Sequence, residues 1–221
     1  MFGETYLRLA ALVSILIASA HGYIVKDGNC SLVSAGIPVV TNFDLQKYLG
    51  RWYEIERYEQ DFLRDLECVT VEYKDNVENA TIELKTKGYS TEKEAYASFT
   101  GTARVYDPLG KPPGGKLIVN YGIKSSNESN YWIVDTDYTR FSIVYTCMQI
   151  DGSESVIEGY WMLSRTPELT EELQITEKLE FLKNTYFIPS HVRSTNQTES
   201  LCRKEPEKQP VPAALILPPL P

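Results

Sequence analysis

Short apolar runs separated by turn-forming clusters occupy the chain between Trp52 and Arg165. In several runs the alternation is strict, as in Ile82-Glu83-Leu84, and a period of two places apolar side chains on one face of a strand. The pattern predicts eight strands, at Arg51–Tyr58, Cys68–Lys74, Thr81–Gly88, Ala95–Tyr106, Lys116–Tyr121, Tyr131–Asp135, Phe141–Met148 and Val156–Arg165. Eight strands with no helix between them predict an all-β protein, built as an antiparallel barrel or a sandwich.

The apolar period changes after the last of these strands. Ile175, Leu179, Leu182 and Tyr186 recur at helical spacing and form one stripe. Thr170 can cap this helix, and the two acidic residues after it complement the positive end of the helix dipole. We expect a single helix whose stripe packs on the body of the protein.

The first 22 residues have the pattern of a secretory signal peptide. Leu9–Ala20 is an apolar run preceded by Arg8 and followed by small residues suited to cleavage, and it is too short to span a membrane. Residues 23–202 then form one domain, with no transmembrane segment. Residues 203–221 hold six of the twelve prolines and are predicted to be a disordered tail.

Secretion changes the interpretation of the cysteines. Four cysteines in an oxidising compartment, with no C-x-x-C pair, predict two disulfides, and three pairings are open. Four N-glycosylation acceptor sequences occur, at Asn29, Asn79, Asn127 and Asn196. Asn29 is the poorest of them, because a cysteine stands in the middle of its acceptor sequence.

The charge and histidine content exclude several functions. A formal net charge of −8, from 30 acidic and 22 basic residues, argues against nucleic-acid binding, which needs clustered Lys and Arg. The chain has only two histidines, His21 and His191, so we predict no metal site, no haem and no catalytic triad.

The chain is rich in tyrosine, with 15 residues. An eight-stranded barrel can hold one small ligand, and tyrosine supplies both apolar area and a hydroxyl group to a ligand cavity. The alternative is that these tyrosines are half-exposed strand residues chosen for β-propensity. Composition alone leaves both interpretations open.

Three motifs carry a family resemblance. Gly50-Arg-Trp52 opens the first strand, Thr136-Asp137-Tyr138 lies between the sixth and seventh, and Arg165 closes the eighth. In this order and at these strand positions they resemble the three signatures of the lipocalins. The longer sequences around the first two motifs, residues 50–56 and 131–138, are most similar to the branch that contains apolipoprotein D, Lazarillo and the insect bilin-binding proteins.

The resemblance implies an eight-stranded antiparallel up-and-down barrel with the C-terminal helix packed on its outside. It assigns Gly50, Trp52, Thr136, Asp137, Tyr138 and Arg165 to the structure of the closed end. There the Arg165 guanidinium can stack on the Trp52 indole, a contact of about 0.5–2 kcal/mol. The resemblance also implies the pairing Cys30–Cys147 and Cys68–Cys202.

Strand alternation then selects candidate ligand contacts. If Trp52 points inward, strict alternation also places Glu54, Glu56 and Tyr58 inside the barrel. The two glutamate carboxylates would then be buried and would need polar partners. The apolipoprotein D branch supports Tyr73, Thr86 and Trp161 as ligand contacts. The predicted ligand-binding residues are Glu54, Tyr58, Val71, Tyr73, Leu84, Thr86, Tyr131, Ile133 and Trp161.

The main hypothesis is a secreted carrier that buries a small hydrophobic ligand, namely a fatty acid, sterol, retinoid or bilin. The resemblance adds lipid transport and stress protection. No cofactor is predicted besides such a bound ligand.

Three alternatives stand beside the carrier. A biliverdin-type pigment could be the ligand, or a filled barrel could use its loops to bind a cell-surface receptor or another protein. A lipid isomerase would need a free thiolate at Cys68, and we predict no enzyme. Phe62 and Leu63 could form a lid edge or membrane-touching tip, although packing across the barrel mouth is the simpler interpretation.

Overall fold

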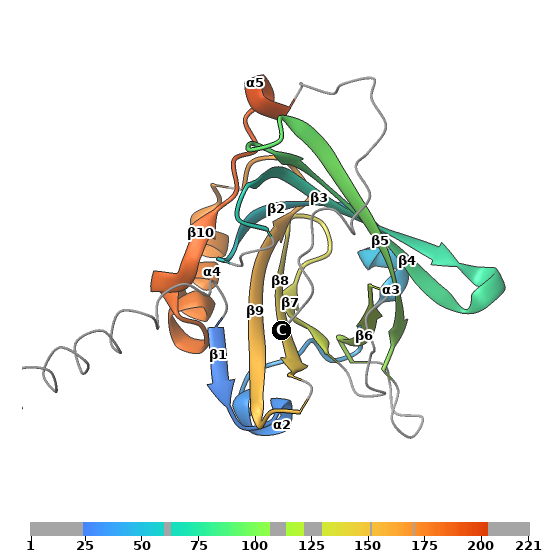
Figure 1. Cartoon of the computed structure of the whole chain (residues 1–221), viewed down its shortest axis with the longest axis vertical. Helices are drawn as coiled ribbons and strands as arrows, with labels where there is room; N and C mark the ends of the chain where they lie inside the picture. The colour runs from blue at the N-terminus through green and yellow to red at the C-terminus, as the bar shows by residue number, and fades with distance from the viewer. Residues whose placement is uncertain are drawn as a thin grey trace, which may run out of the picture.

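Eight consecutive strands close into an antiparallel barrel in the computed structural model, which describes residues 24–59, 63–106, 114–121, 130–150, 152–169 and 171–202 (Figure 1). Each barrel strand pairs with the next along the chain, and β9 pairs with β2 to complete the ring. The strands are β2 (Gly50–Tyr58), β3 (Leu66–Asn76), β4 (Thr81–Ser90), β5 (Ala95–Val105), β6 (Lys116–Asn120), β7 (Tyr131–Thr136), β8 (Phe141–Gln149) and β9 (Ser155–Ser164). The predicted up-and-down barrel is confirmed.

Two short strands extend the sheet and have no counterpart in the prediction. They are β1 (Ile24–Asp27), which pairs with β9, and β10 (Val192–Ser194), which pairs with β2. Each of these strands has too few residues for an alternating pattern to be recognised in the sequence. The β10 strand continues the edge of β2 beyond the segment that pairs with β3. The C-terminal arm, residues 192–202, therefore covers the region where β2 extends beyond its pairing with β3.

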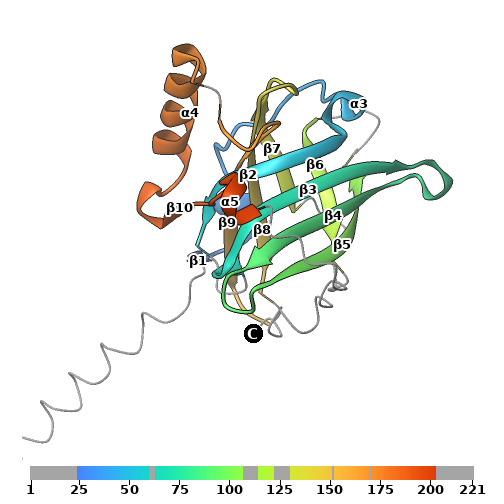
Figure 2. The same ribbon diagram turned by 90° about the horizontal axis from the view of Figure 1, so that it is seen from above.

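One long helix, α4 (Leu173–Tyr186), lies along the outside of the barrel (Figure 2). Its buried residues, which belong to the predicted stripe, are Ile175, Leu179 and Leu182. They pack against outward-facing side chains of the barrel, including Ile143 and Met162. The helix begins later than predicted: Glu172 is its N-cap and makes no side-chain capping bond, while Thr170 lies outside the described residues.

The described part of the chain also has three single-turn α-helices, α2 (Cys30–Val33), α3 (Leu45–Tyr48) and α5 (Glu199–Cys202), and two 3-10 helices, η2 (Val77–Asn79) and η3 (Pro189–His191). The β3–β4 hairpin projects from the body on the side away from α4 (Figures 1 and 2). The predicted signal peptide, residues 1–22, and the predicted tail, residues 203–221, lie outside the described residues, as do Phe62 and Asn127.

Candidate functional site

Side chains from all eight barrel strands meet inside the barrel. One packed cluster includes Trp52, Tyr73, Leu84, Ala103, Val119, Ile133, Val144 and Leu163. Because the strands surround the barrel axis, only the interior can bring one residue of each together. A second cluster contains Leu63, Leu66, Val69 and Ala97, and Trp161 packs against both clusters. The interior is therefore a continuous apolar and aromatic region.

Most of the predicted ligand contacts lie in this interior. Those in or against the first cluster are Val71, Tyr73, Leu84, Tyr131, Ile133 and Trp161. Thr86 shares the inward face of β4 with Leu84 and hydrogen-bonds to Tyr121. The structure brings these side chains together, and their contact with a ligand stays a prediction.

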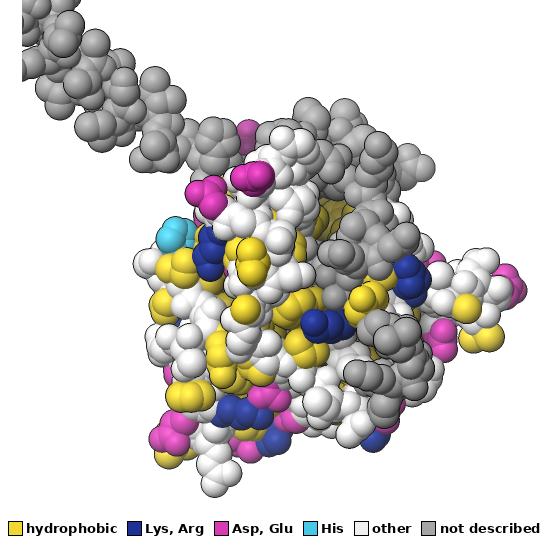
Figure 3. Space-filling model, turned by 90° about the horizontal axis from the view of Figure 1, so that it is seen from below, with side chains coloured by type: hydrophobic (Ala, Val, Ile, Leu, Met, Phe, Trp, Pro, Cys, Tyr) yellow, Lys and Arg dark blue, Asp and Glu magenta, His cyan; other side chains and the backbone are white. Residues whose placement is uncertain are grey.

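Several side chains of the interior clusters are only partly buried. Val71, Phe99, Tyr131 and Trp161 remain partly exposed although they pack with the interior clusters. On the face seen from below, hydrophobic side chains gather near the centre, and some of them lie in a recess (Figure 3). These four inward-facing side chains are thus only partly covered by the protein.

Leu63 is buried among interior side chains. It is 4% exposed and belongs to the second interior cluster. This position agrees with the interpretation of packing across the mouth. Its neighbour Phe62 lies outside the described residues.

The prediction that Tyr58 points inward is wrong. The register between β2 and β9 shifts between Glu54 and Glu56, so one extra residue interrupts the alternation. Tyr58 consequently packs outside the barrel with Tyr160, and its hydroxyl accepts a hydrogen bond from the backbone N–H of Ile188 at 2.7 Å.

The same shift moves Glu56 outward. Its carboxylate faces Lys183 of α4, with an Nζ–Oε2 distance of 3.4 Å. The expectation of an inward Glu56 is therefore also wrong. This pair instead helps hold the helix on the outer face of the barrel.

The shift turns Arg57 inward, where it forms an ion pair with Glu54. Arg57 is fully buried and Glu54 is 3% exposed. The guanidinium also donates to Thr195 Oγ1 (2.9 Å) and to the carbonyls of Leu63 and Leu66. Alternation required a partner for Glu54 but could not name Arg57, because the bulge has no signature in the sequence. Glu54 thus lies buried in the barrel with its charge already neutralised.

Four hydroxyl groups lie in two hydrogen-bonded pairs inside the barrel, and we call them the hydroxyl network: Tyr48 with Ser142, and Tyr73 with Tyr131. The Tyr73 and Tyr131 oxygens are 2.5 Å apart, and the Tyr48 and Ser142 oxygens are 2.9 Å apart. Burial raises the pKa of Tyr48 to about 12, although its bond to Ser142 opposes the shift. Burial also raises the pKa values of Tyr73 and Tyr131 well above 10. The network is therefore uncharged at physiological pH.

Arg165 and Trp52 close one end of the barrel. The Arg165 guanidinium carbon lies 3.7 Å from the centroid of the Trp52 ring. Its nitrogens donate to backbone carbonyls of Lys47, Tyr48, Arg51 and Tyr138 at 2.8–3.2 Å. The Trp52 Nε1–H donates to the Tyr48 carbonyl at 2.9 Å.

Gly50 makes this closure possible. Its φ of +94° is one that L side chains rarely adopt, and a Cβ there would lie 3.5 Å from Arg165 Nη1. The glycine of the first motif is therefore required by its backbone conformation. Its role is structural, as the resemblance implies.

The second motif builds the turn between β7 and β8. Asp137 Oδ1 accepts from the backbone N–H groups of Thr139, Arg140 and Phe141 at 2.7–3.2 Å. Burial alone would raise the pKa of Asp137, but hydrogen bonds from Arg140 lower it below its usual value. The Thr136 hydroxyl accepts from the Tyr138 N–H at 2.9 Å. This turn presents the Tyr138 carbonyl to Arg165.

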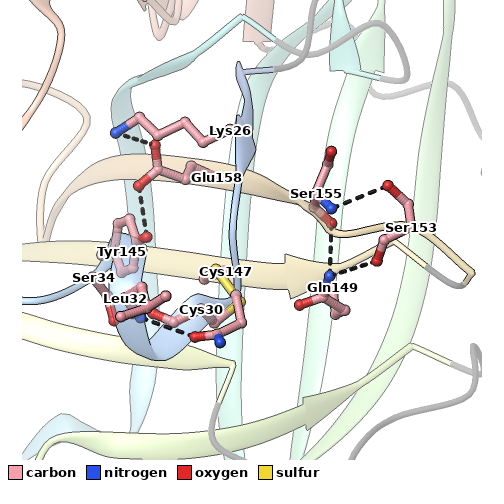
Figure 4. The surroundings of a disulfide bond; sticks show 11 residues. Lys26, Cys30, Leu32, Ser34, Tyr145, Cys147, Gln149, Ser153, Ser155 and Glu158 are labelled. Atoms are coloured by element: carbon pink, nitrogen blue, oxygen red, sulfur yellow. Dashed lines mark hydrogen bonds and ion pairs between the residues drawn. A yellow bond between two sulfur atoms is a disulfide. The ribbon is translucent and has the colours of Figure 1, made fainter.

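Both disulfides have the pairing that the resemblance implies. Cys30–Cys147 joins α2 to β8 next to a buried group in which Glu158 binds Lys26 (2.6 Å) and the Tyr145 hydroxyl (2.7 Å) (Figure 4). Cys68–Cys202 ties β3 to the C-terminal arm. The two disulfides use all four cysteines of the chain, so no free thiol remains. The free thiolate that a lipid isomerase would need at Cys68 is therefore excluded.

The described acceptor asparagines lie at the surface. Asn79 stands at the turn between β3 and β4, and Asn196 lies on the C-terminal arm. Asn29 is also exposed, and its side chain caps α2 by accepting from the Leu32 N–H. Their use as glycosylation sites stays a prediction.

The chain forms an up-and-down barrel of eight strands that is lined with apolar and aromatic side chains. A Trp–Arg stack closes one end. These features define the class of calyx-shaped binding proteins. Residues 43–196 match the family model described as a lipocalin-like domain. The chain belongs to the lipocalins, a family of carriers of small hydrophobic ligands.

Relatives and solved structures agree with this assignment. Apolipoprotein D of Cavia porcellus is 32% identical over 75% of this chain and 82% of its own. The Lazarillo protein of Schistocerca americana is 29% identical over 74% of each chain. The structure of insecticyanin from the tobacco hornworm Manduca sexta superimposes with a TM-score of 0.64 at 20% identity, covering 81% of this chain and 92% of that one. That likeness shows the fold alone.

Two features are absent from the described residues. No helix in this part of the chain is both long and apolar enough to cross a membrane. Within the same residues, no group of three or more His, Cys, Asp or Glu side chains is placed to hold a metal ion.

Proposed function

We propose that this lipocalin is an extracellular carrier that buries a small hydrophobic ligand inside its barrel. The observation that carries the proposal is the partial exposure of inward-facing apolar and aromatic side chains, above all Trp161. A ligand that covers these surfaces gains roughly 25 cal/mol for each Å² of apolar area removed from water. Fatty acids, sterols, retinoids and bilins all supply such area.

Two features support an extracellular location. The two disulfides tie the segments around Cys30 and Cys202 to the barrel, and disulfides persist in oxidising compartments. The apolar run Leu9–Ala20 has the pattern of a cleaved secretory signal. Expression in secreting cells should deliver protein to the medium with an N-terminus near residue 23, as N-terminal sequencing would read. An intact N-terminus, or retention in the cells, would contradict secretion.

A fluorescence titration tests the carrier function. Lipophilic ligands should change tryptophan emission, because Trp161 lies where the ligand would sit. In the matched variant Trp161→Phe most of this change should disappear, while displacement of a solvatochromic dye from the barrel persists. The carrier function is wrong if no ligand of a panel of lipids, sterols, retinoids and bilins changes the emission or displaces the dye.

A further inference from the structure

The geometry points to a residue that controls ligand size: we infer that Gly159 holds the Trp161 indole against the barrel wall and so sets the width of the ligand that the interior accepts. Gly159 acts through Trp161 and is a positioning residue. The inference rests on the proposed carrier function. It deepens that function by naming the residue that admits a ligand wider than a single hydrocarbon chain.

Gly159 lies in the middle of β9, where the backbone does not require glycine. β9 pairs with β8 without a register shift, so alternation places Gly159 on the same inward face as Trp161 and Leu163. Its φ lies outside the left-handed region that favours glycine. Glycine weakens the interior of a strand, and it often marks a place where another group approaches closely. The reason for this glycine therefore lies in what approaches it.

The Trp161 ring is the group that approaches. A Cβ at residue 159 would lie 2.6 Å from both Cη2 and Cζ3 of the indole, far inside the contact distance of two carbon atoms. These two atoms form the far end of the side chain, so the ring lies back along β9 over the glycine. Gly159 is buried, whereas Trp161 keeps part of its surface exposed. A ligand can pack only on the part of the indole that the wall leaves free.

A methyl group at residue 159 would leave the ring one direction in which to move. The wall positions beside Trp161 are taken by its register partners, Val144 on β8 and Arg57 on β2, and both are fully buried. Leu163, the next inward residue on β9, is 2% exposed. The indole must therefore tilt away from β9 toward the barrel axis, into the space that a ligand would use.

A second inward glycine shows why Gly159 is the informative position. Gly101 on β5 is also buried, and a Cβ there would lie 2.5 Å from a ring carbon of Tyr121. It would also lie 2.9 Å from the Asn120 carbonyl oxygen, which belongs to the backbone and cannot turn aside. At Gly159 the three nearest atoms all belong to side chains, namely two indole carbons and the Thr146 hydroxyl oxygen at 2.5 Å. A substitution at Gly159 should therefore move these side chains and not a strand.

The test compares a wide ligand with a narrow one. Pyrene is a rigid system of fused rings, and 1-dodecanol is a single chain. Equilibrium dialysis gives the affinity of each for the wild-type protein, Gly159→Ala, Trp161→Phe, the double variant of these two, and Gly114→Ala. Gly114 is the matched control, because its φ needs no glycine and a Cβ there meets nothing closer than 3.5 Å. The Thr146 contact is present in both variants that carry Gly159→Ala, so the difference between them reports the ring.

In Gly159→Ala, pyrene should bind about tenfold more weakly, because the tilted ring occupies the apolar surface and space that a wide ligand needs. The affinity for 1-dodecanol should change by less than about threefold, since a single chain can pass beside the ring. Phenylalanine at residue 161 lacks the far ring atoms, so the double variant should bind pyrene as tightly as Trp161→Phe alone. Gly114→Ala should change neither affinity.

Near-ultraviolet circular dichroism shows whether the ring moves without a ligand. The contribution of Trp161 is the difference between a protein and the same protein with Trp161→Phe. This contribution should change in Gly159→Ala and stay the same in Gly114→Ala. An unchanged contribution in Gly159→Ala would mean that the ring has not moved and would refute the inference.

Equal weakening of both ligands, no weakening of either, or no rescue in the double variant overturns the inference and leaves the carrier function standing. Loss of the folded barrel in Gly159→Ala has the same consequence, because the ring would then be unable to leave the wall. Wild-type protein that binds 1-dodecanol but not pyrene would also overturn it. If the wild-type protein binds neither ligand, the carrier function fails and the inference fails with it.

Discussion

Replacing Arg57 with methionine would leave a buried carboxylate without its cation. Arg57 is fully buried and Glu54 is 3% exposed, so water cannot take over the lost interactions. Glu54 would keep the hydrogen bond from Thr195 Oγ1, at 2.5 Å. The carbonyls of Leu63 and Leu66 would each lose a charged donor.

The expected cost follows from these contacts. Removing one partner of a buried ion pair costs about 3–5 kcal/mol, because an uncompensated charge stays in the interior. Exchanging both partners for apolar residues of similar volume is often close to neutral. The free energy of unfolding should therefore fall by about 3–5 kcal/mol in Arg57→Met. Adding Glu54→Leu should restore most of that loss.

Urea unfolding with the disulfides intact, followed by tryptophan fluorescence, measures these differences. The control is Lys178→Met, which breaks the more exposed Lys178–Asp135 pair and should cost less than about 1 kcal/mol. The reasoning is refuted if Arg57→Met costs no more than Lys178→Met. It is equally refuted if the double variant is as unstable as Arg57→Met alone.

Three further outcomes are expected. Arg165→Lys keeps the charge but loses the planar fork that reaches four carbonyls, so urea unfolding should show a loss of about 1–3 kcal/mol; an unchanged midpoint would contradict this role. Burial raises the pKa values of Tyr48 and Tyr58 from 10 to about 12, so both hold their protons more tightly when folded. The stability linked to them should be complete below pH 10 and lost as the pH rises toward 12. The difference in absorbance at 295 nm between the wild-type protein and Tyr48→Phe or Tyr58→Phe isolates each group, and a difference that titrates near pH 10 in the folded protein would argue against this burial. Replacing Cys68 and Cys202 with alanine removes a disulfide that closes a loop with a sequence separation of 134, so the free energy of unfolding should fall by about 4–5 kcal/mol. A fall of less than about 1 kcal/mol, measured by thermal unfolding, would show that hydrogen bonds alone hold the C-terminal segment on the barrel.

The strands were predictable because each needs only a local pattern. Alternation at Ile82 and Leu84 reports which face of β4 is buried, and the observed strand ends agree with the predicted ones to within two residues. The stripe of α4 was predictable for the same reason, since the period of the pattern is a property of a few turns. The position of its first residue was not, because Glu172 caps the helix without a side-chain bond.

Which side chains face the interior was predictable only as far as each strand stays regular. Alternation placed Tyr73 and Leu84 inside correctly, but one extra residue between Glu54 and Glu56 exchanged the faces that follow it. Tyr58 thereby moved to the outer surface under α4, and Arg57 took the inward position.

The sequence by itself determined the number and order of the barrel strands, the motifs of the closed end and the outer helix. Local periodicity and turn chemistry carry that information along the chain. Only the tertiary structure decided which cation neutralises Glu54, which interior hydroxyl groups pair with one another, and that β10 pairs with β2. These features join residues far apart in the chain, or depend on a bulge set by pairing with a distant strand. No local pattern encodes such contacts, because they arise only when the barrel closes.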